Sequence, residues 1–145
     1  MTAAGEGAAE PVAARLVTGV TGVEFHVADF ETSLAFYEAL GFRVVRRWED
    51  WARLDRDGAD LVLQGDGYVR GKDHYFTPHM DRSPRGVGVE VVVEVDDVDA
   101  VYAAAKAAEL RIVKDIQDRP WKARDFRLPD PDSYFIRITS PLDGR

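Results

Sequence analysis

Cysteine is absent from this chain of 145 residues. The sequence therefore offers neither disulfide bonds nor thiolate metal ligands, and a chain without disulfides is typical of a reducing, cytoplasmic setting. Long hydrophobic runs are also missing, because no segment approaches the roughly 20 apolar residues that a membrane-spanning helix needs. These absences predict a cytoplasmic protein that does not cross a membrane.

Basic residues are fewer than acidic residues in this sequence. Lys and Arg together number 19 against 26 Asp and Glu, which gives a formal net charge of −7 at pH 7. Nucleic acids select basic surfaces, so no nucleic-acid partner is expected. The same charge favours a cationic small molecule over an anionic one. Residues 1–17 are rich in Ala, Gly and Glu and lack the pattern of a signal peptide, so we expect a disordered N-terminal arm.

The most informative feature that is present is a unit that occurs twice. When the sequence is shifted by 68 positions, Gly22–Glu31 aligns with Glu90–Asp99, and Phe42–Val45 aligns with Leu110–Val113. A duplicated unit builds two facing walls. The residues that point inward from those walls then decide the function.

Each copy has the pattern strand, helix, strand, strand, strand. In the first copy, apolar residues alternate with Glu24 and His26, as in a strand, and Asp29 is placed to cap a helix that Gly41 ends. The predicted strands are 20–27, 42–48, 51–54, 60–64, 89–95, 111–115, 123–128 and 134–139, and the predicted helices are 29–41 and 97–108. We therefore predict an α+β fold of two tandem β-α-β-β-β modules, residues 18–66 and 87–141. Residues 67–86 would link them into one domain, 18–141.

Three stretches of the chain match motifs of one superfamily. They are Val27–Tyr37 with Leu40-Gly41-Phe42, then Val95–Tyr102, and then Arg119-Pro120-Trp121 through Asp125–Arg127 to Asp130–Tyr134. On these residues the chain resembles the vicinal-oxygen-chelate superfamily, which includes glyoxalase I, extradiol dioxygenases and bleomycin-resistance proteins. The resemblance implies a curved mixed sheet around a shared cavity, commonly in dimers. It does not select one function, because a fold hosts many chemistries.

The resemblance also implies where a metal would bind in related enzymes. The equivalent positions here are Gly22 and Glu90 in the first strands of the modules, and Val62 and Arg137 in the last strands. Such a metal needs several His or carboxylate ligands, whereas glycine and valine offer no side-chain donor and arginine repels a cation. We therefore expect no metal and no other cofactor, which argues against glyoxalase or dioxygenase chemistry.

This leads to a functional hypothesis: a metal-free binding protein of the bleomycin-resistance type, rather than an enzyme. It would act by sequestration, holding a small antibiotic-like molecule that is cationic or aromatic. The main alternative is a divergent metal-dependent lyase or dioxygenase. An enzyme that uses His26 and Glu24 for proton transfer, and an accessory protein that works through its surface, also stay open.

The candidate ligand-binding residues come from both modules. They are Glu24, His26, Trp48, Trp51, Glu90, Val92, Phe135 and Arg137. We expect the Arg137 guanidinium to pair with Glu90 or Glu24, because an unpaired buried charge is costly. His74 and His79 flank Pro78 and are expected to lie in a structural loop. We also expect a homodimer, since open sheets have edges that need cover.

Overall fold

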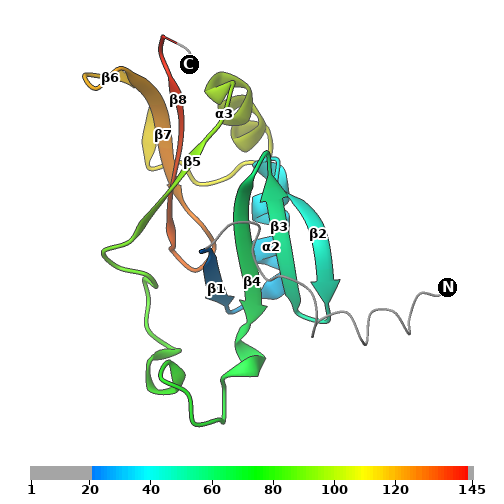
Figure 1. Cartoon of the computed structure of the whole chain (residues 1–145). Coiled ribbons are helices and arrows are strands. Elements are labelled where there is room, and N and C mark those ends of the chain that lie inside the picture. Colours follow the sequence, from blue (N-terminus) through cyan, green and yellow to red (C-terminus); the bar gives the residue numbers. More distant parts are fainter. Residues whose placement is uncertain (1–20, 144–145) are drawn as a thin grey trace, which may run out of the picture.

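The structure is a computed structural model and describes residues 21–143. The predicted disordered arm lies outside these residues. The first half contains β1 (Val23–Val27), α2 (Phe30–Ala39), β2 (Arg43–Trp48), β3 (Trp51–Arg56) and β4 (Ala59–Gly65). The second half contains β5 (Glu90–Glu94), α3 (Val98–Ala107), β6 (Lys114–Arg119), β7 (Ala123–Pro129) and β8 (Phe135–Pro141). Figure 1 shows the two halves side by side, with the chain between β4 and β5 as an extended loop.

The two halves have the same topology. The strands form two four-stranded sheets in the orders β1-β4-β3-β2 and β5-β8-β7-β6. In each sheet the first and last strands of the half pair in parallel, β1 with β4 and β5 with β8, and the other neighbours pair antiparallel. The predicted α+β fold of tandem β-α-β-β-β modules is therefore confirmed, with the strands in two separate sheets.

Both helices begin and end where the sequence predicts. The Asp29 carboxylate accepts a hydrogen bond of 3.2 Å from the backbone N–H of Thr32, and Asp97 accepts one of 3.1 Å from Ala100. Each carboxylate satisfies an N–H group that would otherwise lack a partner in the first helical turn. Gly41 follows α2 with φ of +96°, a conformation that glycine adopts without strain.

Each sheet has one face buried under its own helix. Side chains that alternate along the central strands point to this face, among them Leu61 and Leu63 on β4 and Ile136 and Ile138 on β8, all at most 3% exposed. The opposite face of each sheet carries the intervening residues, many of them charged. The candidate functional residues therefore lie on the faces that the helices leave uncovered.

The prediction for β6 was wrong in position. The strand was expected at 111–115 but begins at Lys114, and residues 111–113 form an irregular segment. The β-branched pair Ile112-Val113 suggested a strand, but pairing with β7 is interrupted by an irregularity between Lys114 and Gln117. Arg111 therefore lies before the first residue of β6 and is exposed.

The segment between the modules holds two short 3₁₀ turns, Asp66–Tyr68 and Thr77–His79, and is otherwise irregular. His74 and His79 lie in this loop, as expected. Across the part of the chain that the structure describes, neither helix is long and apolar enough to traverse a bilayer.

Candidate functional site: a pocket between the linker and the second sheet

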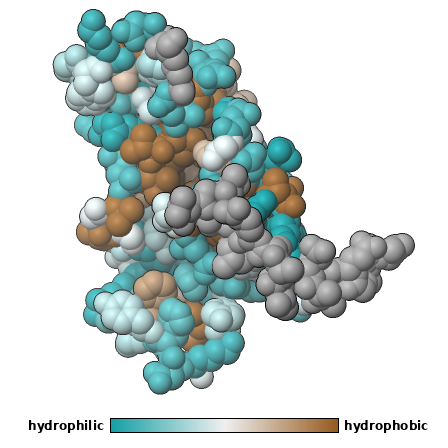
Figure 2. Space-filling model, in the orientation of Figure 1, coloured by the Kyte–Doolittle hydropathy of each residue, from teal (hydrophilic) through white to brown (hydrophobic). Residues whose placement is uncertain are grey.

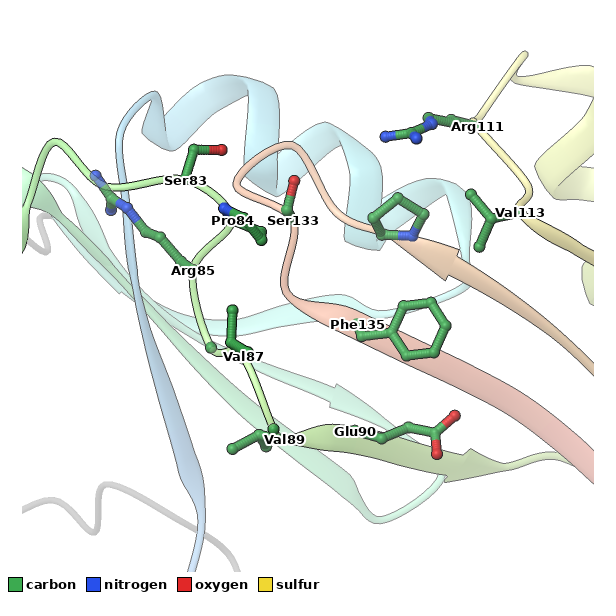
Figure 3. A pocket seen from close by; sticks show the side chains of 13 residues that line it. Ser83, Pro84, Arg85, Val87, Val89, Glu90, Arg111, Val113, Ser133 and Phe135 are labelled. Atoms are coloured by element: carbon green, nitrogen blue, oxygen red, sulfur yellow. The ribbon is translucent and has the colours of Figure 1, made fainter.

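A cavity of about 620 Å³ opens where the end of the linker meets the second sheet. We call it the linker pocket (Figure 3). It is lined by Ser83, Pro84, Arg85, Gly86, Val87, Gly88, Val89, Glu90, Arg111, Val113, Pro129, Ser133 and Phe135. Three separate parts of the chain thus meet around it: the linker end with the start of β5, the segment before β6, and the turn between β7 and β8.

Much of the pocket wall is apolar. Phe135 and Val113 lie on one side of it, and Val87 and Val89 lie on the segment opposite (Figure 3). Val87 is 78% exposed and Val89 58% exposed, which is high for valine. Figure 2 shows hydrophobic side chains gathered over this middle part of the molecule, between two more hydrophilic ends. Covering these side chains with an apolar ligand would be favourable, at about 25 cal/mol per Å².

At the start of β5, Glu90 carries the negative charge of the pocket and is held by two arginines. Its Oε1 lies 3.4 Å from Nη2 of Arg137, and its Oε2 lies 3.4 Å from Nε of Arg127. Arg127 also approaches Asp125, which accepts a hydrogen bond of 2.8 Å from Nε of Arg119. The uncovered face of the second sheet therefore bears three guanidinium groups and two carboxylates in one network.

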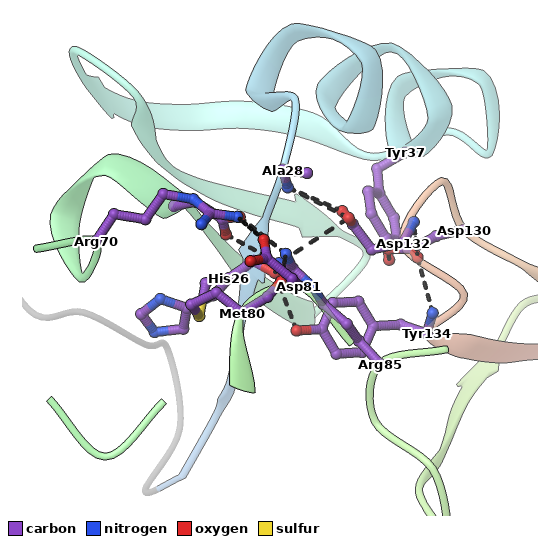
Figure 4. A network of polar contacts seen from close by, with 11 residues as sticks. His26, Ala28, Tyr37, Arg70, Met80, Asp81, Arg85, Asp130, Asp132 and Tyr134 are labelled. Atoms are coloured by element: carbon purple, nitrogen blue, oxygen red, sulfur yellow. Dashed lines mark hydrogen bonds and ion pairs between the residues drawn. The ribbon is translucent and has the colours of Figure 1, made fainter. Parts of the chain in front are cut away.

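Arg85 fixes the other side of the pocket. Its two terminal nitrogens each lie 2.8 Å from one oxygen of the buried Asp66, in a forked pair. Figure 4 shows Arg85 at the centre of a network of polar contacts. They also donate to the backbone carbonyl groups of His26, at 2.9 Å, and Met80, at 2.6 Å. Burial raises the pKa of Asp66, but the hydrogen bonds and charge of Arg85 outweigh it and lower the pKa below its ordinary value. This network ties the linker to β1 and so shapes the pocket.

The turn between β7 and β8 is held by a buried carboxylate. Asp130 accepts a hydrogen bond of 2.6 Å from the Tyr37 hydroxyl, and it also accepts from the backbone N–H groups of Asp132 and Tyr134. Burial raises the pKa of Asp130 to about 6, against the opposing effect of these hydrogen bonds. The Tyr134 hydroxyl donates to the His26 carbonyl, so the same turn also contacts the first module.

The structure separates the predicted site residues into two groups. Glu90 and Phe135 line the linker pocket, whereas Val92 and Arg137 lie farther along the same face of β5 and β8. The expected contact between Arg137 and Glu90 is present. Four of the candidate residues therefore lie on the second sheet, and two of these four line the linker pocket.

The other four candidates lie on the first sheet. Glu24 and His26 are in contact, with 3.3 Å between Oε2 and Nε2. The strand register places His26, Gln64, Trp51 and Trp48 in one row across the uncovered face. His26 is 7% exposed, and its ring meets the linker residue Phe76 edge to face, with 5.1 Å between ring centroids. None of these four lines the linker pocket.

The residues at the metal positions do not fit a divalent ion. Gly22 offers no donor, and Val62 is a buried aliphatic side chain. Both Glu90 oxygens face guanidinium groups, and one of those belongs to Arg137 at another of the four positions. Within residues 21–143, no group of three or more His, Asp or Glu side chains is arranged to hold a metal. The side chains at these four positions therefore do not form a metal site.

Several pocket residues were not predicted from the sequence. Val87, Val89, Arg111 and Val113 were missed because their role depends on how the linker folds back against the second sheet. One signal was available in the sequence. Gly86-Val87-Gly88-Val89 combines glycines with valines directly before a strand, and this is a pattern typical of a backbone that bends while presenting apolar side chains.

Comparison with known proteins agrees with the fold. A lactoylglutathione lyase from Schizosaccharomyces pombe is 28% identical over 127 residues, and the match covers 77% of this chain but 41% of the lyase. The chain therefore spans less than half the length of that relative. A bleomycin resistance protein from Klebsiella pneumoniae is 26% identical over 117 residues, covering 76% of this chain and 82% of the relative.

A solved structure of a bleomycin-binding protein complexed with bleomycin has the same fold. Its TM-score is 0.62 at 23% sequence identity, and the likeness covers 85% of this chain and 98% of that one. The family model for the Glyoxalase/Bleomycin resistance protein/Dioxygenase superfamily matches residues 20–138, which is most of the chain. The protein therefore belongs to the Glyoxalase/Bleomycin resistance protein/Dioxygenase superfamily.

Proposed function

We propose that the protein binds a small organic molecule in the linker pocket and acts by sequestration, keeping an antibiotic-like compound from its target. The observation that carries this proposal is the pocket itself. Its volume of about 620 Å³ lies in the range of roughly 300–1,000 Å³ that is usual for small-molecule sites. Its wall combines apolar side chains with a few charged groups, as such sites do.

The comparisons support a binding role. One relative is a bleomycin resistance protein, and a protein of the same fold has been solved with bleomycin bound. The aromatic part of the expected ligand suits Phe135, whose ring lines the pocket and can stack on a flat molecule.

The enzymatic alternatives have weaker support. A proton-transfer site would need His26 to present a nitrogen to its substrate. However, Nε2 of His26 faces Glu24, and Nδ1 is buried without a hydrogen-bond partner among the described residues. A metal-dependent lyase or dioxygenase would need a set of donors that the described residues do not supply.

Two further expectations belong to this proposal. A homodimer would cover the edge strands β1 and β5, and sedimentation would then give about twice the mass of 16.2 kDa. The predicted cytoplasmic location follows only from the composition, and fractionation of cells that express the protein would test it.

A thermal-shift screen tests the proposal, because any ligand of the native state raises the midpoint of unfolding. Aromatic antibiotics, bleomycin among them, should include compounds that raise it. Val113→Trp, which fills the pocket, should abolish the shift for each of these compounds. Val23→Trp is the matched control, since Val23 is an exposed valine of the first sheet outside the pocket lining. Shifts that survive Val113→Trp would contradict the proposed site.

A further inference from the structure

We propose that the linker pocket selects molecules that join a flat apolar body to an anionic group such as a carboxylate, and that Arg111 recognises that group. This inference rests on the proposed function, because it names the class of ligand for the same pocket. The net charge of −7 led us to expect a cationic ligand, and the inference replaces that expectation with an anionic one.

Arg111 is a positively charged pocket residue whose guanidinium makes no ion pair with the described residues. It lines the pocket from the segment before β6, is exposed, and forms no ion pair or hydrogen bond with any other residue in 21–143. Figure 3 shows its side chain extending toward Ser133 on the turn between β7 and β8. A guanidinium presents two parallel N–H donors that match a carboxylate. Arg111 can therefore receive an anion without first breaking another contact.

Arg85, the other pocket arginine, does not compete for this role. Its terminal nitrogens are engaged by both oxygens of Asp66 and by the carbonyl groups of His26 and Met80. Its side chain is 12% exposed. Withdrawing it from Asp66 would leave a buried carboxylate unpaired, which is strongly unfavourable.

Glu90, the pocket carboxylate, is a poor partner for a cationic ligand. Both of its oxygens already face guanidinium groups, those of Arg137 and Arg127. A ligand cation at Glu90 would be placed beside two like charges, and its repulsion from them would offset its attraction to Glu90. The Glu90 carboxylate, where a cationic ligand would bind, is therefore already paired with two arginines of the protein.

The charge balance next to the pocket points the same way. Arg127 and Arg137 are two cations beside the single carboxylate of Glu90. Arg111 increases the positive excess near the pocket. Salt screens charges beyond about 8–10 Å. These local groups therefore decide the sign of the charge that the pocket accepts, and distant acidic residues do not.

The remaining lining sets the shape of the ligand. Phe135 and Val113 offer an apolar surface between Arg111 and Glu90, and Val87 and Val89 lie on the segment opposite (Figure 3). A flat ring fits this arrangement by stacking on Phe135. A ring that carries a short carboxylate arm therefore satisfies both the apolar wall and Arg111.

Three probes with one ring and different charges test the inference: 2-naphthylacetate, 2-naphthylethanol and 2-naphthylethylamine. Isothermal titration should show the acetate binding most tightly and the amine most weakly. Arg111→Gln should weaken binding of the acetate about tenfold, the factor that corresponds to the loss of one charge-assisted contact, and should leave the alcohol unchanged. Arg43→Gln is the matched control, because Arg43 is the equivalent residue of the first module and is exposed.

The outcomes separate the two proposals. If the amine binds as tightly as the acetate, or if Arg111→Gln does not weaken the acetate, the anionic class is overturned while binding in the pocket stands. If no probe binds, the proposed ligand class is overturned, and the thermal-shift screen still tests the proposed function. If Val113→Trp leaves the binding of every probe unchanged, the linker pocket is not the site and the proposed function itself is contradicted. A tenfold loss in Arg43→Gln as well would show a general charge effect and would overturn the role of Arg111.

Discussion

Glu90 and Arg137 form an ion pair between the parallel strands β5 and β8, with 3.4 Å between Oε1 and Nη2. In the register of these strands Arg137 lies opposite Val92, so Glu90 is its diagonal neighbour on the same face. The resemblance to metalloenzymes assigns metal-ligand positions to both residues. In this chain a charge pair joins the two strands at those positions.

The first prediction concerns this pair. Arg137→Leu should lower the free energy of unfolding by about 1 kcal/mol, because the pair is partly exposed and Glu90 keeps Arg127 as a second partner. Adding Glu90→Gln should cost less in this background than it costs alone, because one of the two ion pairs of Glu90 is already absent. Urea unfolding of the wild type, both single variants and the double variant measures the coupling. Strictly additive losses would mean that the two side chains do not interact.

The second prediction concerns divalent metals. Zinc, nickel, manganese or iron should not raise the unfolding midpoint of the protein, because the metal-equivalent positions offer Glu90 as the sole side-chain donor. Arg137→His adds a second donor beside Glu90 and is the informative comparison. A stoichiometric complex of the wild type that Glu90→Gln abolishes would refute this account of the site.

The third prediction concerns the linker. Arg85→Leu should cost about 3 kcal/mol or more, because it leaves the buried Asp66 without its forked partner. Arg70→Leu removes a contact of 3.4 Å from the same carboxylate but involves a side chain that is 48% exposed, so its cost should be under about 1 kcal/mol. Chemical denaturation compares the two variants. Equal costs would show that the forked geometry contributes nothing.

The fourth prediction concerns pH. The pKa of Asp130 is raised to about 6, so the folded state holds this proton more tightly than the unfolded state. The resulting stability is fully present below the unfolded pKa of about 4 and is lost as the pH rises through 6. Asp130→Asn removes this titration. The stability of the wild type relative to this variant should therefore fall by about 2 kcal/mol between pH 4 and pH 7.

Urea unfolding of both proteins at the two pH values measures this difference, and titrating groups far from Asp130 cancel in the comparison. Parallel stability profiles for the wild type and Asp130→Asn would contradict the raised pKa.

Much of the fold could be predicted because its determinants are local. Alternation along β1 and the capping carboxylates of Asp29 and Asp97 act within a few residues, and the repeat then supplies the second module. β6 was misplaced because the apolar pair Ile112-Val113 suggests a strand, while pairing with β7, which depends on contacts distant in the sequence, begins at Lys114.

The site could be predicted only in part. Glu90 and Phe135 lie on strands, where the period of two residues fixes the face, so their position in the pocket follows from the fold. Val87 and Arg111 lie on irregular segments that long-range contacts position. Arg85 reaches Asp66 and the turn at Asp132, and no sequence periodicity signals such contacts.

The most direct test of ligand binding in the linker pocket is a titration of ¹⁵N-labelled protein with 2-naphthylacetate, followed by two-dimensional NMR. The account predicts that the largest shift changes fall on the backbone amides of Val87, Gly88, Arg111 and Phe135. The indole N–H signals of Trp48 and Trp51 should stay in place. Changes concentrated at Trp48, Trp51 and His26, with the linker pocket unaffected, would place the ligand on the first sheet and contradict the account.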